Sequence, residues 1–105
     1  MSTLKKILIA TYNIAGNHKG YNHDQMVTVM RSFNADIWLL QEVMGATPNR
    51  TQAHALADAL RMNCLFGQAH QHRVFGNAIL SRFPLTQRHE LELPRGSLTR
   101  DDKSR

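Results

Sequence analysis

Two short apolar runs that end in polar residues constrain the fold of this chain more than any other feature. The first run covers residues 7–12 and leads into Asn13, and the second covers residues 36–43 and carries Gln41 and Glu42 near its end. The first is rich in strand-forming residue types, and the second is almost continuously apolar, as in a central strand covered on both faces. We therefore expect one strand in each run.

The segment between the two runs has the pattern of a helix. Its apolar residues recur at i, i+3, i+4 and i+7: Met26, Val29, Met30 and Phe33. Asn22 or Asp24 is available as the N-cap, and Asn34 can end the helix. A strand, a crossover helix and a second strand of these lengths predict two parallel strands that lie side by side.

The second half of the chain continues this alternation. A loop at residues 44–50 leads into a helix expected at residues 51–61, and strands are expected at residues 63–67, 77–82 and 85–93. Pro84 marks the break between the last two strands. We interpret residues 1–105 as one partial α/β domain, with a motif-bearing region at residues 7–93 and a polar tail at residues 94–105.

Length and composition agree with one small domain. The chain has 105 residues, of which 42% are hydrophobic, enough for one core and too few for two. Cys64 is the only cysteine, so no internal disulfide can form and a reducing compartment is expected. The apolar runs are too short for a signal peptide or a membrane span, which predicts a cytoplasmic protein. The formal charge of +5 favours polyanions in general, although several of the basic residues lie in the polar tail.

Asn13 and Glu42 are the candidate metal ligands. The carboxyl ends of parallel neighbouring strands meet at one edge of the sheet, so both side chains could reach one ion there. Carboxylate and amide oxygens suit Mg²⁺ or Mn²⁺, and Mg²⁺ completes its shell with water and phosphate oxygens, which points to phosphoester hydrolysis. The alternative from spacing alone is that Asn13 is a turn residue and Glu42 an exposed strand terminus.

Three segments resemble, in the right order, the first three motifs of the endonuclease/exonuclease/phosphatase superfamily. They are Ile-Ala-Thr-Tyr-Asn-Ile at 9–14, Ala-Asp-Ile-Trp-Leu-Leu-Gln-Glu-Val at 35–43, and Gly-Asn-Ala-Ile-Leu-Ser-Arg-Phe-Pro-Leu at 76–85. The polar stretch at 49–52 before a helix also fits the family pattern. The resemblance implies the N-terminal portion of a two-sheet α/β sandwich of the deoxyribonuclease type, and a phosphoesterase that depends on Mg²⁺ or Mn²⁺.

The resemblance also implies roles for individual residues. Glu42 corresponds to the principal metal ligand, and Asn13 to a residue that helps to bind the metal or orients its ligands. Gln41 is expected to support the site by hydrogen bonding, whereas Asn77 and Ser81 are expected to be structural. The implied partner is a phosphoester substrate, with nucleic acid among the candidates, and the sequence gives no indication of the oligomeric state.

Two later motifs of the family do not occur in this sequence. One is the Gly-Asp-x-Asn motif, whose Asp activates water, and the other is the Ser-Asp-His motif, whose His stabilises phosphate; the pair Asp101-Asp102 is not followed by His. We therefore assign no catalytic residue and expect a truncated chain that is inactive or nearly so. The alternatives are a non-catalytic fragment that binds phosphate compounds or another chain, and an inert remnant of an interrupted gene.

The histidines offer a second, weaker metal hypothesis. His70 and His72 would lie on one face of a strand and could form a metal pair. Residues 68–73 are more typical of a polar hairpin tip, which would place both side chains at the surface. His18 and His23 flank the loop after Asn13, where they could approach a phosphate or be solvated.

Overall fold

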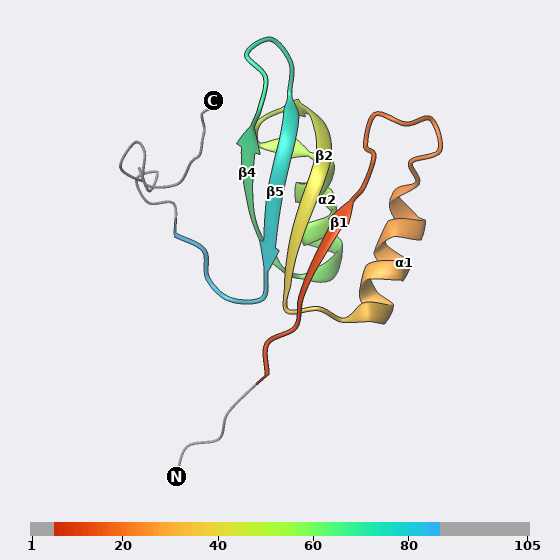
Figure 1. The fold of residues 1–105 in the computed structure, drawn as a ribbon, viewed down its shortest axis with the longest axis vertical. Coiled ribbons are helices and arrows are strands. Elements are labelled where there is room, and N and C mark those ends of the chain that lie inside the picture. Colours follow the sequence, from red (N-terminus) through yellow and green to blue (C-terminus); the bar gives the residue numbers. More distant parts are fainter. Residues whose placement is uncertain (1–5, 87–105) are drawn as a thin grey trace, which may run out of the picture.

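The computed structural model describes residues 6–86, which form a sheet of five strands and two helices (Figure 1). The elements are β1 (Ile9–Asn13), α1 (His23–Phe33), β2 (Ile37–Thr47), β3 (Arg50–Thr51), α2 (Gln52–Leu60), β4 (Asn63–Gln68) and β5 (Phe75–Ser81). The strand order is β1-β2-β5-β4, and β3 pairs with β2. The prediction of an α/β fold is confirmed.

The first two strands form the expected parallel pair. Their register places Ile9 opposite Ile37 and Asn13 opposite Gln41, and α1 makes the crossover between them. The Asn22 side chain caps α1 by accepting a hydrogen bond from the Gln25 N–H, and Asn34 ends the helix in the left-handed conformation with φ 55°. Asparagine suits both positions, because its short polar side chain replaces a missing helical partner and it tolerates positive φ.

The strand β2 is longer than predicted. The sequence predicted a loop at residues 44–50, whereas β2 continues to Thr47 and turns directly into β3. Long-range pairing decides this difference, since Met44 pairs with Phe75 of β5 and Gly45 with Thr51 of β3. A Cβ on Gly45 would lie 2.5 Å from the carbonyl oxygen of Arg50, so this close turn requires glycine.

The predicted strands at 63–67 and 77–82 correspond to β4 and β5, which form an antiparallel hairpin. The predicted strand at 85–93 starts with residues 85 and 86, which are not in a strand, and its residues 87–93 lie outside the described residues. Neither helix in residues 6–86 has the length and apolar character needed to cross a membrane.

The core lies between one face of the sheet and the two helices. Met30 of α1 and Leu56 of α2 are fully buried against Leu40 of β2 and Leu80 of β5. Because side chains alternate between the faces of a strand, the neighbouring residues face the other way. On that second face Ile9 is 57% exposed and Leu39 is 38% exposed, so this face carries accessible apolar side chains within the described part of the chain.

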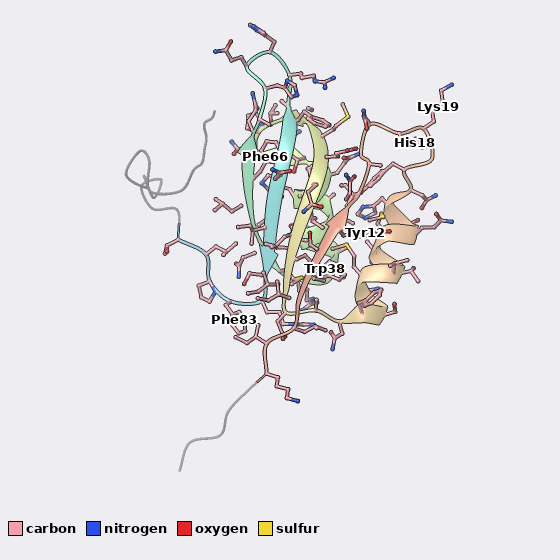
Figure 2. All side chains as sticks on the ribbon, viewed as in Figure 1. Tyr12, His18, Lys19, Trp38, Phe66 and Phe83 are labelled. Atoms are coloured by element: carbon pink, nitrogen blue, oxygen red, sulfur yellow. The ribbon has the colours of Figure 1, made fainter. Side chains whose placement is uncertain are left out.

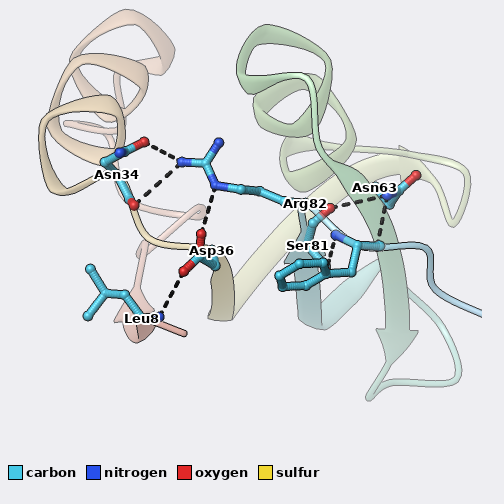
Figure 3. Close-up of polar contacts among 7 residues, drawn as sticks. Leu8, Asn34, Asp36, Asn63, Ser81 and Arg82 are labelled. Atoms are coloured by element: carbon cyan, nitrogen blue, oxygen red, sulfur yellow. Dashed lines mark hydrogen bonds and ion pairs between the residues drawn. The ribbon is translucent and has the colours of Figure 1, made fainter. Parts of the chain in front are cut away.

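A polar network fixes the end of the sheet where β1 and β2 begin (Figure 3). The Asp36 carboxylate forms an ion pair with Arg82 Nε at 3.1 Å and accepts the Leu8 N–H at 2.9 Å. The Arg82 guanidinium also donates to the side-chain and backbone oxygens of Asn34 at the end of α1. On β4, Asn63 donates to the backbone carbonyls of Ser81 and Phe83. The network therefore ties the helix end to strand ends that are distant in sequence.

Candidate metal centre

Asn13 and Glu42 meet at the end of the sheet opposite the Asp36–Arg82 network. Asn13 is the last residue of β1, and its Nδ2 donates a hydrogen bond to Glu42 Oε2 at 2.9 Å. The parallel pairing of β1 and β2 brings these residues together across 29 positions of sequence. The two side chains proposed from the sequence as metal ligands therefore form one polar pair.

An irregularity in β2 directs Glu42 to this position. Leu40 and Val43 are both fully buried, although a regular strand would place residues three apart on opposite faces. The register with β5 shifts between these two residues, and Glu42 has the left-handed φ of 57°. Such a bulge inserts an extra residue and changes the direction of a side chain. It turns Glu42 away from the core, so that its carboxylate reaches Asn13.

Both polar atoms of the Asn13 side chain are engaged. While Nδ2 donates to Glu42, Oδ1 accepts the N–H of Ala15 at 2.9 Å. Ala15 itself has a positive φ of 49°, so the chain turns sharply as it leaves β1. In this arrangement the asparagine holds the carboxylate of Glu42 in a fixed orientation, and its own oxygen stabilises the turn.

Two of the other residues considered from the sequence are neighbours of this pair in the sheet: Gln41 is opposite Asn13, and Asn77 lies between the residues of β5 that pair with Leu40 and Val43. Gln41 Nε2 donates to Thr11 Oγ1 at 2.9 Å and to the Leu39 carbonyl at 3.1 Å, so its side chain links β2 to β1 rather than to Glu42. Ser81 is buried at the far end of the sheet, where its Oγ accepts the Phe83 N–H. Asn77 is exposed on β5.

Gln52 is a residue near the site that the sequence did not single out. It is the first residue of α2, and its side chain bridges two backbone groups. Oε1 accepts the Met44 N–H and Nε2 donates to the Gly16 carbonyl, both at 2.9 Å. Its only signal in the sequence was membership of the polar stretch at 49–52, because nothing local reveals a partner 36 positions away.

The oxygen donors of the Asn13–Glu42 pair fit Mg²⁺ or Mn²⁺ and do not fit zinc. Residues 6–86 contain no group of three or more His, Cys, Asp or Glu side chains that could hold an ion. A single carboxylate is not a zinc site, which takes three or four nitrogen or sulfur ligands. It does fit Mg²⁺ or Mn²⁺, because Mg²⁺ accepts one or two carboxylates and keeps water or phosphate oxygens in its remaining positions.

Basic side chains lie at the same end of the sheet. His18 and Lys19 lie in the loop that follows β1 (Figure 2), and His18 Nδ1 accepts the Gly20 N–H at 3.0 Å. His70 and His72 are exposed in the connection between β4 and β5, at the surface as the hairpin-tip interpretation predicted. In the same connection the Arg73 guanidinium lies 4.8 Å from the ring centre of Phe75, which pairs with Met44. The cationic side chains Lys19 and Arg73 therefore lie in loops at the same end of the sheet as Glu42.

The chain is similar to known proteins in sequence pattern and in fold. The model of the endonuclease/exonuclease/phosphatase family matches residues 10–101. Among solved structures, the chain is similar to the crystal structure of an endonuclease/exonuclease/phosphatase from Beutenbergia cavernae DSM 12333, with a TM-score of 0.53 and 18% identity. The similarity covers 77% of this chain and 27% of that chain, so the present chain corresponds to about a quarter of its length. Comparison with curated proteins gives no match.

Proposed function

Because the chain belongs to the endonuclease/exonuclease/phosphatase family, we propose that it carries the metal-binding part of a hydrolase that cleaves phosphoric esters. The hydrogen bond between Asn13 and Glu42 carries this proposal, since it sets one carboxylate in a fixed orientation at the carboxyl ends of two parallel strands. Ligand sites of open α/β sheets form at such an edge. The fold and the family assignment, both predicted from the sequence, agree with this function.

In the proposed site, Glu42 is the principal ligand of Mg²⁺ or Mn²⁺. Asn13 binds one oxygen of the carboxylate, Oε2, which leaves Oε1 for the cation. The hydrogen bond reduces the rotation of the carboxylate, so less conformational entropy is lost when the metal binds. When bound, the cation supplies positive charge to a phosphoryl oxygen and lowers the pKa of a coordinated water.

The proposed substrate is a phosphoester, with nucleic acid among the candidates. Lys19 lies in the loop that follows β1 and Arg73 in the connection between β4 and β5, at the same end of the sheet as Glu42, and both can attract a phosphate. The net charge of +5 has the same sign as these groups. The class of phosphoester depends on loop residues and does not follow from the fold.

The 105-residue chain is proposed to bind metal and phosphate with little or no turnover. Its sequence lacks the two motifs that resemblance to the family assigns to water activation and phosphate stabilisation. Groups that act as a unit in phosphoryl chemistry are strongly interdependent, and loss of one member typically lowers the rate by orders of magnitude. The competing interpretation, an inert remnant, predicts a chain that shows no cooperative thermal melt.

Titration of Mn²⁺ into the 105-residue protein tests the proposed function. We expect Glu42→Gln to weaken Mn²⁺ binding at least about tenfold, because the substitution removes the charged ligand and keeps its shape. Asp58→Asn is the control, since it removes an exposed carboxylate on α2 and is expected to leave binding unchanged. Hydrolysis of bis(p-nitrophenyl) phosphate by the wild type should not exceed that by Glu42→Gln. Equal Mn²⁺ affinity of Glu42→Gln and the wild type would contradict the proposal.

A further inference from the structure

We infer that Gln52 is a positioning residue for the Asn13–Glu42 pair. Its side chain connects the backbone that follows Asn13 to the backbone that follows Glu42. This inference rests on the function proposed above. Gln52 has no ionisable group, and its side chain forms hydrogen bonds to backbone groups of Met44 and Gly16. It therefore acts on the Glu42 carboxylate through the backbone.

The backbone of β2 loses its regular partner beyond the end of β1. Asn13, the last residue of β1, is opposite Gln41, and the next hydrogen bonds come from the outgoing loop. The Ile14 N–H donates to the Gln41 carbonyl at 3.0 Å, and the Gly16 N–H donates to the Glu42 carbonyl at 2.8 Å. Further along, Gln52 Oε1 accepts the Met44 N–H.

Gln52 closes these contacts into a ring. Its Oε1 binds the N–H two residues after Glu42, and its Nε2 binds the carbonyl of Gly16, whose own N–H binds the Glu42 carbonyl. The side chain is partly buried, and it uses one donor and one acceptor in good geometry. One glutamine therefore fixes the spacing between the loop after Asn13 and the bulge that contains Glu42.

The ring is needed because the backbone on both sides is strained. Glu42 has φ 57° and Ala15 has φ 49°, and a non-glycine residue in this region costs about 1–3 kcal/mol. Such conformations persist only where surrounding contacts hold them. The pairing of β2 with β5 is interrupted at this bulge, so the hydrogen bonds of Gln52 replace part of the lost constraint.

The packing at Gly16 supports a constraint of this kind. A Cβ built on Gly16 would overlap Gln52 Oε1 and would lie 2.7 Å from the Glu42 carbonyl oxygen. Glycine thus allows the loop, the helix residue and the bulge to touch directly. Without the glutamine side chain, the bulge is free to relax toward a regular strand, which turns the Glu42 side chain toward the core and away from Asn13.

Mn²⁺ titration of Gln52→Leu in the 105-residue protein tests the inference. Leucine keeps the size of the side chain and the helical propensity but removes both hydrogen bonds. We expect Mn²⁺ binding about 10–100-fold weaker than in the wild type, at a temperature where thermal melts show both proteins to be fully folded. Gln25→Leu is the matched control, because Gln25 is an exposed glutamine in the first turn of α1. The Mn²⁺ affinity of this variant should equal that of the wild type.

A second measurement requires no metal and separates positioning from a general loss of stability. In the metal-free protein, nuclear Overhauser contacts between the Asn13 side-chain amide and the Glu42 methylene protons should be lost in Gln52→Leu and kept in Gln25→Leu. If Gln52→Leu gives no cooperative melt, Gln52→Glu takes its place, since it keeps the acceptor for Met44 and removes the donor to Gly16.

The outcomes separate this inference from the proposed function. If Glu42→Gln weakens Mn²⁺ binding while folded Gln52→Leu binds as tightly as the wild type, Gln52 has no positioning role and the metal site stands. If Glu42→Gln leaves binding unchanged, the metal site fails, and the Asn13–Glu42 contacts in the metal-free protein then decide the role of Gln52. Persistence of those contacts in Gln52→Leu overturns the inference.

Discussion

At the residue scale, the conformations of Glu42 and Asn13 do not follow from the residues next to them in the sequence. Glu42 adopts a left-handed conformation that is costly for a glutamate, and Asn13 uses both ends of its amide to hold the carboxylate and the following turn. The cost is consistent with a functional role, because strained residues cluster at sites that need a fixed geometry. Cys64 is a contrasting case, since burial is the main cause of its raised pKa.

The Cys64 thiol predicts how stability depends on pH. Burial, with a smaller contribution from the nearby Asp58 carboxylate, raises the pKa of Cys64 from 9.0 to about 11. The folded state therefore retains this proton after the unfolded state has lost it, and the free energy of unfolding falls as the pH rises from about 9 through 11. Urea melts between pH 8 and 11 check this, and Cys64→Ala should show a smaller fall. An equal fall in both proteins would argue against the assignment.

At the element scale, the ends of the helices follow from local sequence, whereas the ends of the strands follow from long-range contacts. The ends of α1 follow from its own sequence, because Asn22 and Asn34 are a good N-cap and a good left-handed C-cap. The start of α2 is also local, since the Thr51 side chain accepts backbone N–H groups and His54 completes a capping box. The ends of the strands depend instead on residues that are far away in the sequence, such as those around Asp36.

Asp36 tests how much one such contact stabilises the elements that it joins. Asp36→Asn removes the charge that faces Arg82 but keeps an acceptor for the Leu8 N–H. We expect it to lower the free energy of unfolding by about 0.5 kcal/mol, the usual contribution of a partly exposed ion pair. Asp36→Ala also removes that acceptor and should cost about 1–2 kcal/mol. Chemical denaturation of both variants provides the measurement. Equal losses would show that the Leu8 hydrogen bond adds nothing to stability.

At the scale of the whole molecule, the two faces of the sheet differ in what covers them. Both helices pack on one face, while the other carries accessible apolar side chains such as Ile9 and Leu39. Accessible apolar surface of this kind promotes association and binds hydrophobic dyes. The family resemblance implies a second sheet in the complete sandwich, and residues 6–86 supply one sheet with its helices.

We expect lysine substitutions at two neighbouring leucines of β2 to have very different effects on stability. Leu39→Lys lies on the accessible face, so it should change the free energy of unfolding by less than about 1 kcal/mol and lower the binding of an apolar fluorescent dye. Leu40→Lys lies in the core at 1% exposure and should cost more than about 4 kcal/mol, which abolishes a cooperative melt. Thermal melts and dye titrations distinguish the two. A Leu39→Lys protein that fails to fold would show that this face is part of the core.

Elements with local signals could be predicted from the order of residue types alone. Apolar periodicity predicted the β1–α1–β2 unit and its parallel pairing, and the polar ends of the two runs pointed to Asn13 and Glu42. Their motifs also indicated the family, which the match over residues 10–101 confirms. The elements could be predicted because each depends on residues within one turn or one strand of each other, and the parallel pairing could be predicted because a crossover helix connects the two strands.

Three features arise from contacts between elements and appear only in the folded chain: the extension of β2 to Thr47, the bulge at Glu42 and the bridge made by Gln52. Each depends on a partner from another element: Phe75 pairs with Met44, and Gly16 receives the Gln52 side chain. A bulge moves a side chain to the other face of a strand, so the alternation in the sequence gives the opposite orientation for Glu42. The direction of the carboxylate is therefore set by hydrogen bonds across the fold, which the order of residue types does not contain.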